Sequence, residues 1–285
     1  MRKNPQGALH QIDIKGDGSG IVAITETPEA KSGLAREYSS IADIRVPLTT
    51  KQQPRMQLAG RLNDTNPFYG GARIVGQGPN GNAIECTAGW PVQGRTTGYW
   101  FLVTAAHCGY DGQYWWNGDF SQGIGYATGE KPYEDVMLVR MTGPATSPVM
   151  WDGGVPGGAN TSPEFTKFVS SWAHTTPGEY LCTSGSFSGA VCNWQVRSDF
   201  PFEYCASDAW GTYECRGDMF VADQIYGVLG CRGGDSGGPV FSLNSDYSRV
   251  IAEGIMSSCS DKDGGSIVGF QDYATISQIE DVLIY

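Results

Sequence analysis

The chain has 285 residues, of which 40% are hydrophobic and 17% charged, a balance that is typical of a globular protein and excludes a disordered one. Its net charge is −11 without a cluster of Lys or Arg, so neither nucleic acid nor a membrane is an expected partner. No apolar run approaches the ~18–20 residues that cross a bilayer. The 40 glycines form no repeat and predict many tight turns between short strands.

The N-terminal 66 residues are predicted to form a segment of their own. Residues 8–24 predict two strands around a glycine-rich turn, and residues 28–42 predict a helix. Residues 44–48 are compatible with another strand. Residues 49–66 are polar and lack periodicity, which predicts a linker.

The pattern changes at Pro67. Short apolar runs, such as residues 99–103, 136–139 and 250–252, alternate with turns at spacings near ten residues. This pattern is typical of an antiparallel all-β sandwich or barrel. The last apolar residues, 282–285, predict a final strand or the end of a short helix.

The cysteine pattern favours disulfides in an oxidising compartment. The count is even and the residues are scattered through the chain. A zinc site would need C-x-x-C pairs or Cys/His clusters, which are absent in a chain with only three histidines, so no metal is expected. The cysteines are Cys86, Cys108, Cys182, Cys192, Cys205, Cys215, Cys231 and Cys259.

The clearest chemical motif surrounds Ser236, in the run Gly-Asp-Ser-Gly-Gly-Pro at residues 234–239. Gly-x-Ser-x-Gly also describes the nucleophile elbow of α/β-hydrolases. That fold needs a histidine after the serine, and no histidine follows Ser236. The motif therefore predicts a serine nucleophile in a different fold.

A serine nucleophile needs a base, and His107 is the best candidate. It lies in Thr-Ala-Ala-His-Cys, directly after a predicted buried strand and beside a cysteine, so its position is well defined. His10 lies in the N-terminal segment. His174 lies in a Ser/Thr-rich loop, which favours a solvated side chain.

The base in turn needs a carboxylate to orient it. Asp135 stands at the start of a predicted buried strand and is the best candidate. Asp119 and Asp152 are weaker, because both lie in glycine-rich loops. Glu134 is adjacent to Asp135 but is expected to point to the opposite face of the strand.

With these motifs in the order His, Asp, Ser, residues 67–285 resemble the chymotrypsin-like serine peptidases. The motifs are T-A-A-H-C, D-V-M-L and G-D-S-G-G-P. Residues 68–74 and 181–192 resemble the bacterial secreted branch of streptogrisin and α-lytic protease. The resemblance implies an all-β fold of two antiparallel Greek-key barrels with the active site between them. It also implies a secreted, monomeric serine endopeptidase that cleaves protein or peptide substrates without a cofactor. The chain begins without the apolar stretch of a signal peptide, so we expect that the signal is trimmed or that export takes another route.

The resemblance implies a role for each site residue. Ser236 attacks the scissile carbonyl, His107 transfers the proton and Asp135 orients His107. The backbone N–H groups of Gly234 and Ser236 form the oxyanion hole.

The resemblance also places the substrate pocket. Leu229 and Gly230 are expected at its base, Arg232 at its rim, and Ser257 and Ser258 along its wall. No aspartate stands at the base, so cleavage after Lys or Arg is not expected. Met256 occupies the position at which glutamate-specific relatives have a histidine. We therefore predict a preference for apolar residues, while Arg232 keeps acidic substrates open.

The family pattern implies disulfides between Cys86 and Cys108, Cys182 and Cys192, and Cys231 and Cys259, which leaves Cys205 with Cys215. Residues 1–66 resemble the C-terminal part of a bacterial pro-region, so the chain is expected to be a zymogen. An unrelated N-terminal extension is the alternative.

One departure from the pattern concerns Asp235, which in the family needs a buried cation. The bacterial arginine that follows the equivalent of Cys182 is Thr183 here. Cleavage after Arg73 would free the amine of Ile74 as a substitute. We favour instead Arg232 or another arginine, with the natural cut near residues 66–68.

Two other functions remain open on the sequence. A pseudoprotease would act as a binding module, but such relatives have usually lost a triad residue and none is missing here. An esterase would use the same triad.

Overall fold

The computed structural model describes residues 9–15, 19–25, 47–52, 60–78, 81–143, 148–199, 201–207, 211–260 and 264–284. The chain divides into two compact units, residues 1–58 and 59–285. Each is described by itself.

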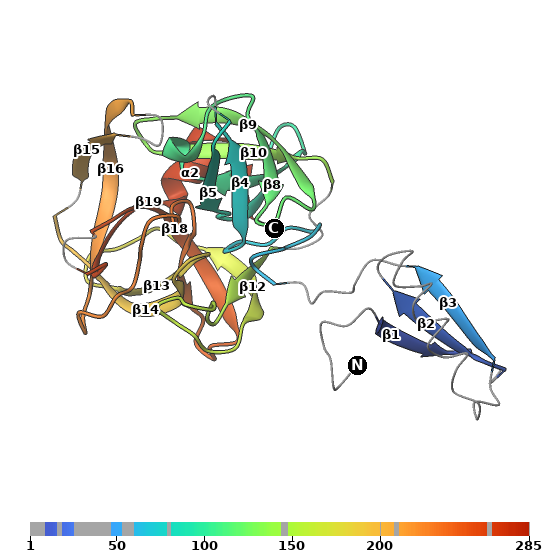
Figure 1. The fold of residues 1–285 in the computed structure, drawn as a ribbon. Coiled ribbons are helices and arrows are strands. Elements are labelled where there is room, and N and C mark those ends of the chain that lie inside the picture. Colours follow the sequence, from blue (N-terminus) through green and yellow to red (C-terminus); the bar gives the residue numbers. More distant parts are fainter. Residues whose placement is uncertain are drawn as a thin grey trace. The chain divides into compact units, whose positions relative to one another are not determined.

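The first unit contains a three-stranded sheet, drawn in blue in Figure 1. Its strands are β1 (Leu9–Ile14), β2 (Ile21–Thr25) and β3 (Leu48–Gln52). β1 and β2 pair antiparallel, whereas β2 and β3 pair parallel. The two strands predicted in residues 8–24 are confirmed. The third strand begins at Leu48, where the strand predicted for 44–48 ends, and the predicted helix 28–42 lies outside the described residues.

The second unit begins with an eight-stranded sheet. All neighbouring strands in it pair antiparallel. In sheet order its strands are β20 (Val282–Leu283), β6 (Pro91–Gly94), β7 (Trp100–Thr104), β10 (Val136–Met141), β9 (Gly123–Lys131), β8 (Tyr114–Asn117), β4 (Arg73–Gln77) and β5 (Ala83–Thr87).

A second, nine-stranded sheet follows, and the two together confirm the all-β, two-barrel fold. One 3-10 turn, η1 (Ala106–Cys108), and one helix, α2 (Tyr273–Ile279), interrupt the strands of this unit in the described residues. The second sheet contains β11 (Val149–Asp152), β12 (Phe165–Trp172), β18 (Arg249–Cys259), β17 (Pro239–Leu243), β13 (Tyr180–Gly185), β14 (Gly189–Val196), β16 (Tyr213–Gln224) and β15 (Phe202–Ser207), with β19 (Ile267–Asp272) paired to β16 and β18.

Three apolar clusters form the core, and each contains a fully buried tryptophan. Trp115 lies in the cluster of the first sheet and Trp194 in that of the second. Trp90 lies in the cluster that joins both sheets, and its Nε1 donates to the carbonyl of Gly254 at 2.8 Å. The apolar side chains buried between the two sheets hold these sheets in one arrangement. A site built from residues of both sheets requires such a fixed arrangement.

The boundary between the units lies earlier in the chain than the sequence predicts. The units divide between residues 58 and 59, so residues 60–66 belong to the second unit. Arg61 and Asp64 are buried there, and the N–H of Arg73 donates to the carbonyl of Arg61 at 2.7 Å. We call residues 60–66 the strap. The pattern of apolar residues in the sequence gives no sign of it, because its buried side chains are charged. In the described part of the chain, no helix is long and apolar enough to cross a membrane.

Candidate active site

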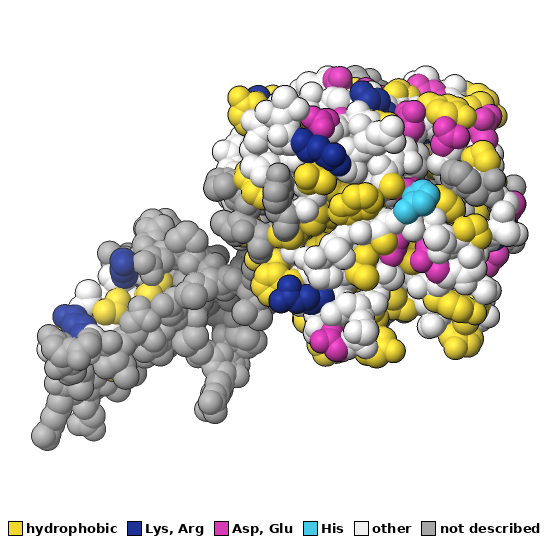
Figure 2. All heavy atoms as spheres, turned by 180° about the vertical axis from the view of Figure 1, so that it is seen from behind, with side chains coloured by type: hydrophobic (Ala, Val, Ile, Leu, Met, Phe, Trp, Pro, Cys, Tyr) yellow, Lys and Arg dark blue, Asp and Glu magenta, His cyan; other side chains and the backbone are white. Residues whose placement is uncertain are grey.

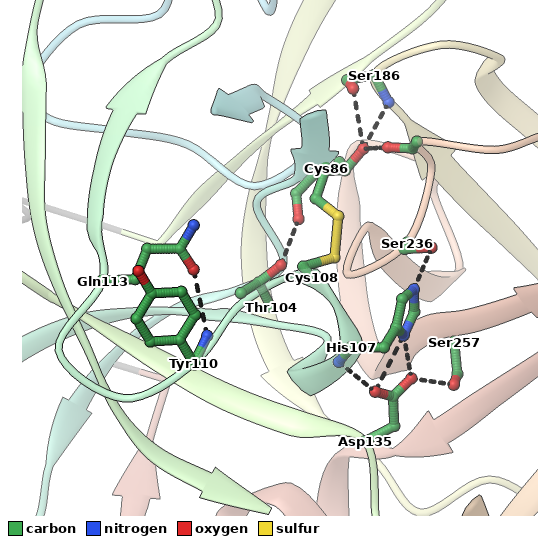
Figure 3. Close-up of a disulfide and its surroundings, with 12 residues drawn as sticks. Cys86, Thr104, His107, Cys108, Tyr110, Gln113, Asp135, Ser186, Ser236 and Ser257 are labelled. Carbon is green, nitrogen blue, oxygen red and sulfur yellow. Dashed lines mark hydrogen bonds and ion pairs between the residues drawn. A yellow bond between two sulfur atoms is a disulfide. The ribbon is translucent and has the colours of Figure 1, made fainter. Parts of the chain in front are cut away.

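Three separate elements bring the predicted catalytic side chains together. His107 lies in η1, directly after β7, and Asp135 lies in the turn between β9 and β10. Ser236 lies in the loop that precedes β17 of the second sheet. Figure 3 shows the three side chains pointing toward one another, beside the disulfide from Cys86 to Cys108.

Hydrogen bonds connect the three side chains in the order Ser236, His107, Asp135. His107 Nε2 lies 2.8 Å from Ser236 Oγ, and His107 Nδ1 lies 2.8 Å from Asp135 Oδ2. The backbone N–H of His107 also donates to Asp135 Oδ1, at 2.9 Å. The imidazole is therefore placed to take a proton from the serine while its other nitrogen donates to a carboxylate.

Asp135 is fully buried and held in place by several donors. Burial alone would raise the pKa of its carboxyl, but the charge and hydrogen bonds of His107, together with the hydroxyl of Ser257, outweigh burial and keep the pKa below its usual value. The backbone of Asp135 has a φ of 55°, a left-handed conformation that is uncommon outside glycine. Such a conformation persists where the surroundings fix it.

The loop around Ser236 leaves two N–H groups available. Gly234 has a φ of 90°, and a Cβ there would lie 2.3 Å from the Phe187 ring, so only glycine fits. Thr87 binds the carbonyls of this loop, its Oγ1 donating to Gly234 and its N–H to Ser236. Within the described residues, the N–H groups of Gly234 and Ser236 donate to no acceptor.

The buried carboxylate of Asp235 is held by backbone donors. The N–H groups of Phe187 and Ser188 donate to its Oδ1 at 2.9 and 3.0 Å, and the N–H of Arg232 donates to its Oδ2 at 2.9 Å. Burial nevertheless raises the pKa of Asp235 above its ordinary value. The guanidinium of Arg232 donates instead to the carbonyl of Gly157 at 3.2 Å.

Arg61 brings a buried cation close to Asp235, which the sequence did not single out. Its side chain is inaccessible to solvent and pairs with Glu164 at 3.0 Å. Its Nη1 donates to Ser184 Oγ and to the carbonyl of Gly185, and its Nη2 donates to the carbonyl of Asp152. A Cβ on Gly185 would lie 2.1 Å from Asp235 Oδ1, so this one residue separates the guanidinium from the carboxylate. Arg61 is thus a candidate for the buried cation near Asp235 that the sequence left open.

Arg73 and Ile74 are continuous in strand β4. Ile74 is buried there and pairs with Cys86 on β5 and Asn117 on β8. The guanidinium of Arg73 lies 3.7 Å from the centre of the Phe187 ring and donates to the carbonyl of Ser186. In the uncut chain, both residues are thus part of the first sheet.

A cavity of about 90 Å³ opens beside Ser236. Three of the predicted pocket residues, Arg232, Ser257 and Ser258, line it, together with the buried side chain of Met256. The cavity is thus lined by one apolar side chain, two hydroxyl groups and an arginine.

The two residues predicted at the pocket base lie elsewhere. Leu229 is 44% exposed and lines a different groove, with its side chain against Gly265. At Gly230 a Cβ would lie 2.4 Å from the Trp194 ring, so this residue packs on the core rather than on the cavity.

The remaining candidate bases and carboxylates do not join the site. His174 pairs with Asp272 at 2.8 Å and is largely exposed, as expected for a loop histidine. Asp119 binds Ser121 within its own turn, and Asp152 pairs with Lys167. The side chain of His10 lies outside the described residues.

Three disulfides pair as the resemblance implied, between Cys86 and Cys108, Cys182 and Cys192, and Cys231 and Cys259, and the remaining two cysteines, Cys205 and Cys215, pair with each other. In the described part of the chain, the one group of possible metal ligands is Glu203 with Cys205 and Cys215. Because these two sulfurs are bonded to each other, they are not available to a metal.

Comparison with known proteins identifies a family and structures of similar fold. The family model described as trypsin matches residues 93–279. A glutamic acid-specific serine protease, whose substrate binding uses a histidine triad, is 23% identical with a TM-score of 0.57, over 76% of this chain and 100% of its own. Protease A of Thermobifida fusca is 24% identical with a TM-score of 0.54, over 75% and 96%, and the Nocardiopsis protease is 21% identical with a TM-score of 0.53, over 75% and 97%. These structures share the fold. No curated protein matches the sequence.

Proposed function

Because the chain belongs to the trypsin family of serine peptidases, we propose that it is a secreted endopeptidase with His107, Asp135 and Ser236 as its catalytic triad. The observation that carries the proposal is the 2.8 Å contact between His107 Nε2 and Ser236 Oγ, with Asp135 at 2.8 Å behind the imidazole. These are the distances at which a nucleophile, its base and the orienting carboxylate act together.

The reaction proceeds in two halves. Ser236 Oγ attacks the scissile carbonyl carbon while its proton passes to His107 Nε2, and the carbonyl oxygen becomes an oxyanion. The N–H groups of Gly234 and Ser236 stabilise that oxyanion. The proton then moves from His107 to the leaving amine, which departs and leaves an acyl-enzyme. Water attacks the ester in the same way, and the proton returns to Ser236 Oγ.

We propose that the residue before the cleaved bond is apolar. Met256 contributes an apolar side chain to the cavity beside Ser236, and Ser257 and Ser258 add no charge. Arg232 favours the second candidate, an acidic residue, because its side chain lines the same cavity. No carboxylate lines the cavity except that of Asp235, which three backbone N–H groups hold, so a basic substrate side chain has no free counter-charge among the described residues.

Secretion and processing complete the proposal. Four disulfides favour an oxidising compartment. On the face shown in Figure 2, the Lys and Arg side chains drawn in colour lie singly, which does not favour nucleic acid as a partner. The enzyme acts as a monomer on protein or peptide substrates. The N-terminal segment serves as a pro-region. In place of the cut near residues 66–68 that the sequence suggested, we propose a cut before Arg61, because its buried side chain belongs to the second unit.

A set of aryl phosphonates that differ only in the residue occupying the pocket tests activity and preference together. We expect Phe and Leu reagents to label Ser236 faster than Glu reagents, and Lys reagents to label slowest. Ser236→Ala should abolish labelling and lower kcat by about 10⁴–10⁶-fold.

Wild-type protein that takes up no reagent would indicate a binding module instead of an enzyme. Fastest labelling by the Glu reagent would replace the apolar preference with the acidic one. Cleavage of esters but not of matched peptides would point to an esterase.

A further inference from the structure

The hairpin of β15 and β16 reaches the catalytic carboxylate from the second sheet. The two strands lie side by side at the edge of the unit (Figure 1) and are joined by the disulfide from Cys205 to Cys215. Directly beside this disulfide, Tyr204 and Arg216 lie opposite each other in the strand register. Both cysteines are exposed, whereas Arg216 is 2% exposed.

Arg216 approaches one oxygen of Asp135. Its Nε lies 3.4 Å from Asp135 Oδ1, and both side chains are buried. Within the described residues this Nε has no hydrogen-bond partner, so its contact with Asp135 is one of charge. The other end of the guanidinium, Nη2, donates to Glu214 Oε2 at 3.3 Å.

Tyr204 reaches the other oxygen of Asp135 through Ser257. The Tyr204 hydroxyl lies 2.8 Å from Ser257 Oγ, and Ser257 Oγ donates to Asp135 Oδ2. Because Ser257 uses its proton on Asp135, Tyr204 is the donor to Ser257. Burial and the negative charge of Asp135 raise the pKa of Tyr204 to about 12, so the hydroxyl keeps its proton.

The hairpin is also tied to the turn that carries Asp135. The N–H of Gly217 donates to the carbonyl of Tyr133 at 2.8 Å, and the Tyr133 hydroxyl donates to Glu203 Oε2 at 3.2 Å. A Cβ on Gly217 would lie 2.4 Å from that hydroxyl, so the hairpin and the turn are in close contact. The position of Arg216 relative to Asp135 is therefore fixed from two sides.

We infer that Arg216 is a positioning residue that tunes the pH range of the proposed triad by sharing the negative charge of Asp135. This role rests on the proposed function. An arginine stays charged throughout the working pH range, so its field acts on Asp135 at every pH. It favours the ionised carboxylate and weakens the net attraction that an imidazolium at His107 experiences. Removing the arginine would strengthen that attraction, and an imidazolium cannot accept the proton of Ser236.

The other titratable groups around Asp135 come from several elements. His107 faces it from η1 and Arg216 from β16, and Tyr204 on β15 reaches it through Ser257. Glu214 on β16 pairs with Arg216, whereas Glu203 on β15 and Asp218 on β16 act on Tyr133. Tyr133 and Glu134 belong to its own turn. Among these groups in the described chain, Arg216 is the one cation within ion-pair distance of Asp135 apart from His107.

The first test is kcat/KM of Arg216→Gln as a function of pH. Without the cation, the acidic limb of the profile should move to higher pH by about one unit, with kcat falling and KM nearly unchanged. Arg216→Lys keeps the charge and should restore most of the wild-type profile. A residue that only supports packing would change stability without moving the limb.

Glu214→Gln supplies a second test that does not depend on replacing a buried arginine. Glu214 is partly exposed, and its negative charge partly cancels the effect of Arg216 on Asp135. Without that charge the effect of Arg216 is stronger, so the acidic limb should move to lower pH. Asp218→Asn removes an equal charge from an exposed position of β16 and should leave the limb in place.

Profiles of Arg216→Gln and Glu214→Gln that superimpose on the wild type would overturn the role of Arg216. If Arg216→Gln does not fold, the Glu214→Gln profile decides alone. Absence of phosphonate labelling of wild-type Ser236 would overturn the proposed function instead, so the two failures are distinguishable.

Discussion

At the scale of residues, the site depends on charged side chains that are buried and precisely paired. Asp135, Asp235, Arg61 and Arg216 are each at most 2% exposed, although charged residues seldom lie inside a protein. Each has hydrogen-bond or ion partners that offset the loss of water. Their loss is therefore expected to cost more than the loss of any surface charge.

Arg61→Met is the sharpest test at this scale. The change leaves Glu164 Oε2 and the Gly185 carbonyl without the guanidinium that donates to them, so the free energy of unfolding should fall by about 3–5 kcal/mol. Denaturant unfolding in a Ser236→Ala background, which prevents self-digestion, measures this loss. The control is Arg95→Met, an exposed arginine paired with Asp281, which should change stability little. Equal effects of the two substitutions would show that burial of Arg61 is unimportant.

At the scale of elements, the strap of residues 60–66 matters most, because it ties the start of the second unit to both of its sheets. Arg61 binds carbonyls that lie next to β11 and β13 of the second sheet, and the carbonyl of Asp64 accepts from Asn117 Nδ2 on β8 of the first. An element that contributes buried contacts to both halves cannot be removed without loss of packing. Processing is therefore expected to spare it.

The N-terminus of the active, secreted enzyme tests this expectation. Intact mass and N-terminal sequencing should give a start at or before Arg61, which retains its side chain. A uniform start between residues 66 and 68 would contradict the role of the strap. A uniform start at Ile74 would favour a freed amine as the partner of Asp235.

At the scale of the whole molecule, buried carboxylates link stability to pH. Burial raises the pKa values of Asp64, Glu253 and Glu280 to about 7. For Asp64 the ordinary value is 3.8, so between pH 3.8 and about 7 the folded protein binds more protons than the unfolded chain. Stability contributed by this group is therefore complete below pH 3.8 and declines as the pH rises through 7.

Asp64→Asn should remove this part of the pH dependence. The amide oxygen still accepts from the N–H of Tyr69, while no charge is buried at high pH. Unfolding measured across this range should show a gain in stability at pH 8 of up to about 4 kcal/mol, and little or none below pH 4. Asp119→Asn, at an exposed position, should keep the wild-type slope. An equal change at both pH values would show that Asp64 acts through packing and not through its charge.

The sequence by itself determined an all-β fold class and the identity of the three candidate catalytic residues, whereas the two barrels and the disulfide pairing were implied by its resemblance to a family. These features are local: short apolar runs specify strands, and contiguous motifs carry His107, Asp135 and Ser236 with their neighbours. Only the tertiary structure decided which buried cations support them. Arg61 and Arg216 belong to no periodic pattern and to no motif. Packing of the strands brings the strap of residues 60–66, which carries Arg61, and the hairpin of β15 and β16, which carries Arg216, next to the site. Leu229 departed from its predicted place for the same reason, since the surroundings of a loop side chain depend on tertiary packing rather than on its position along the chain.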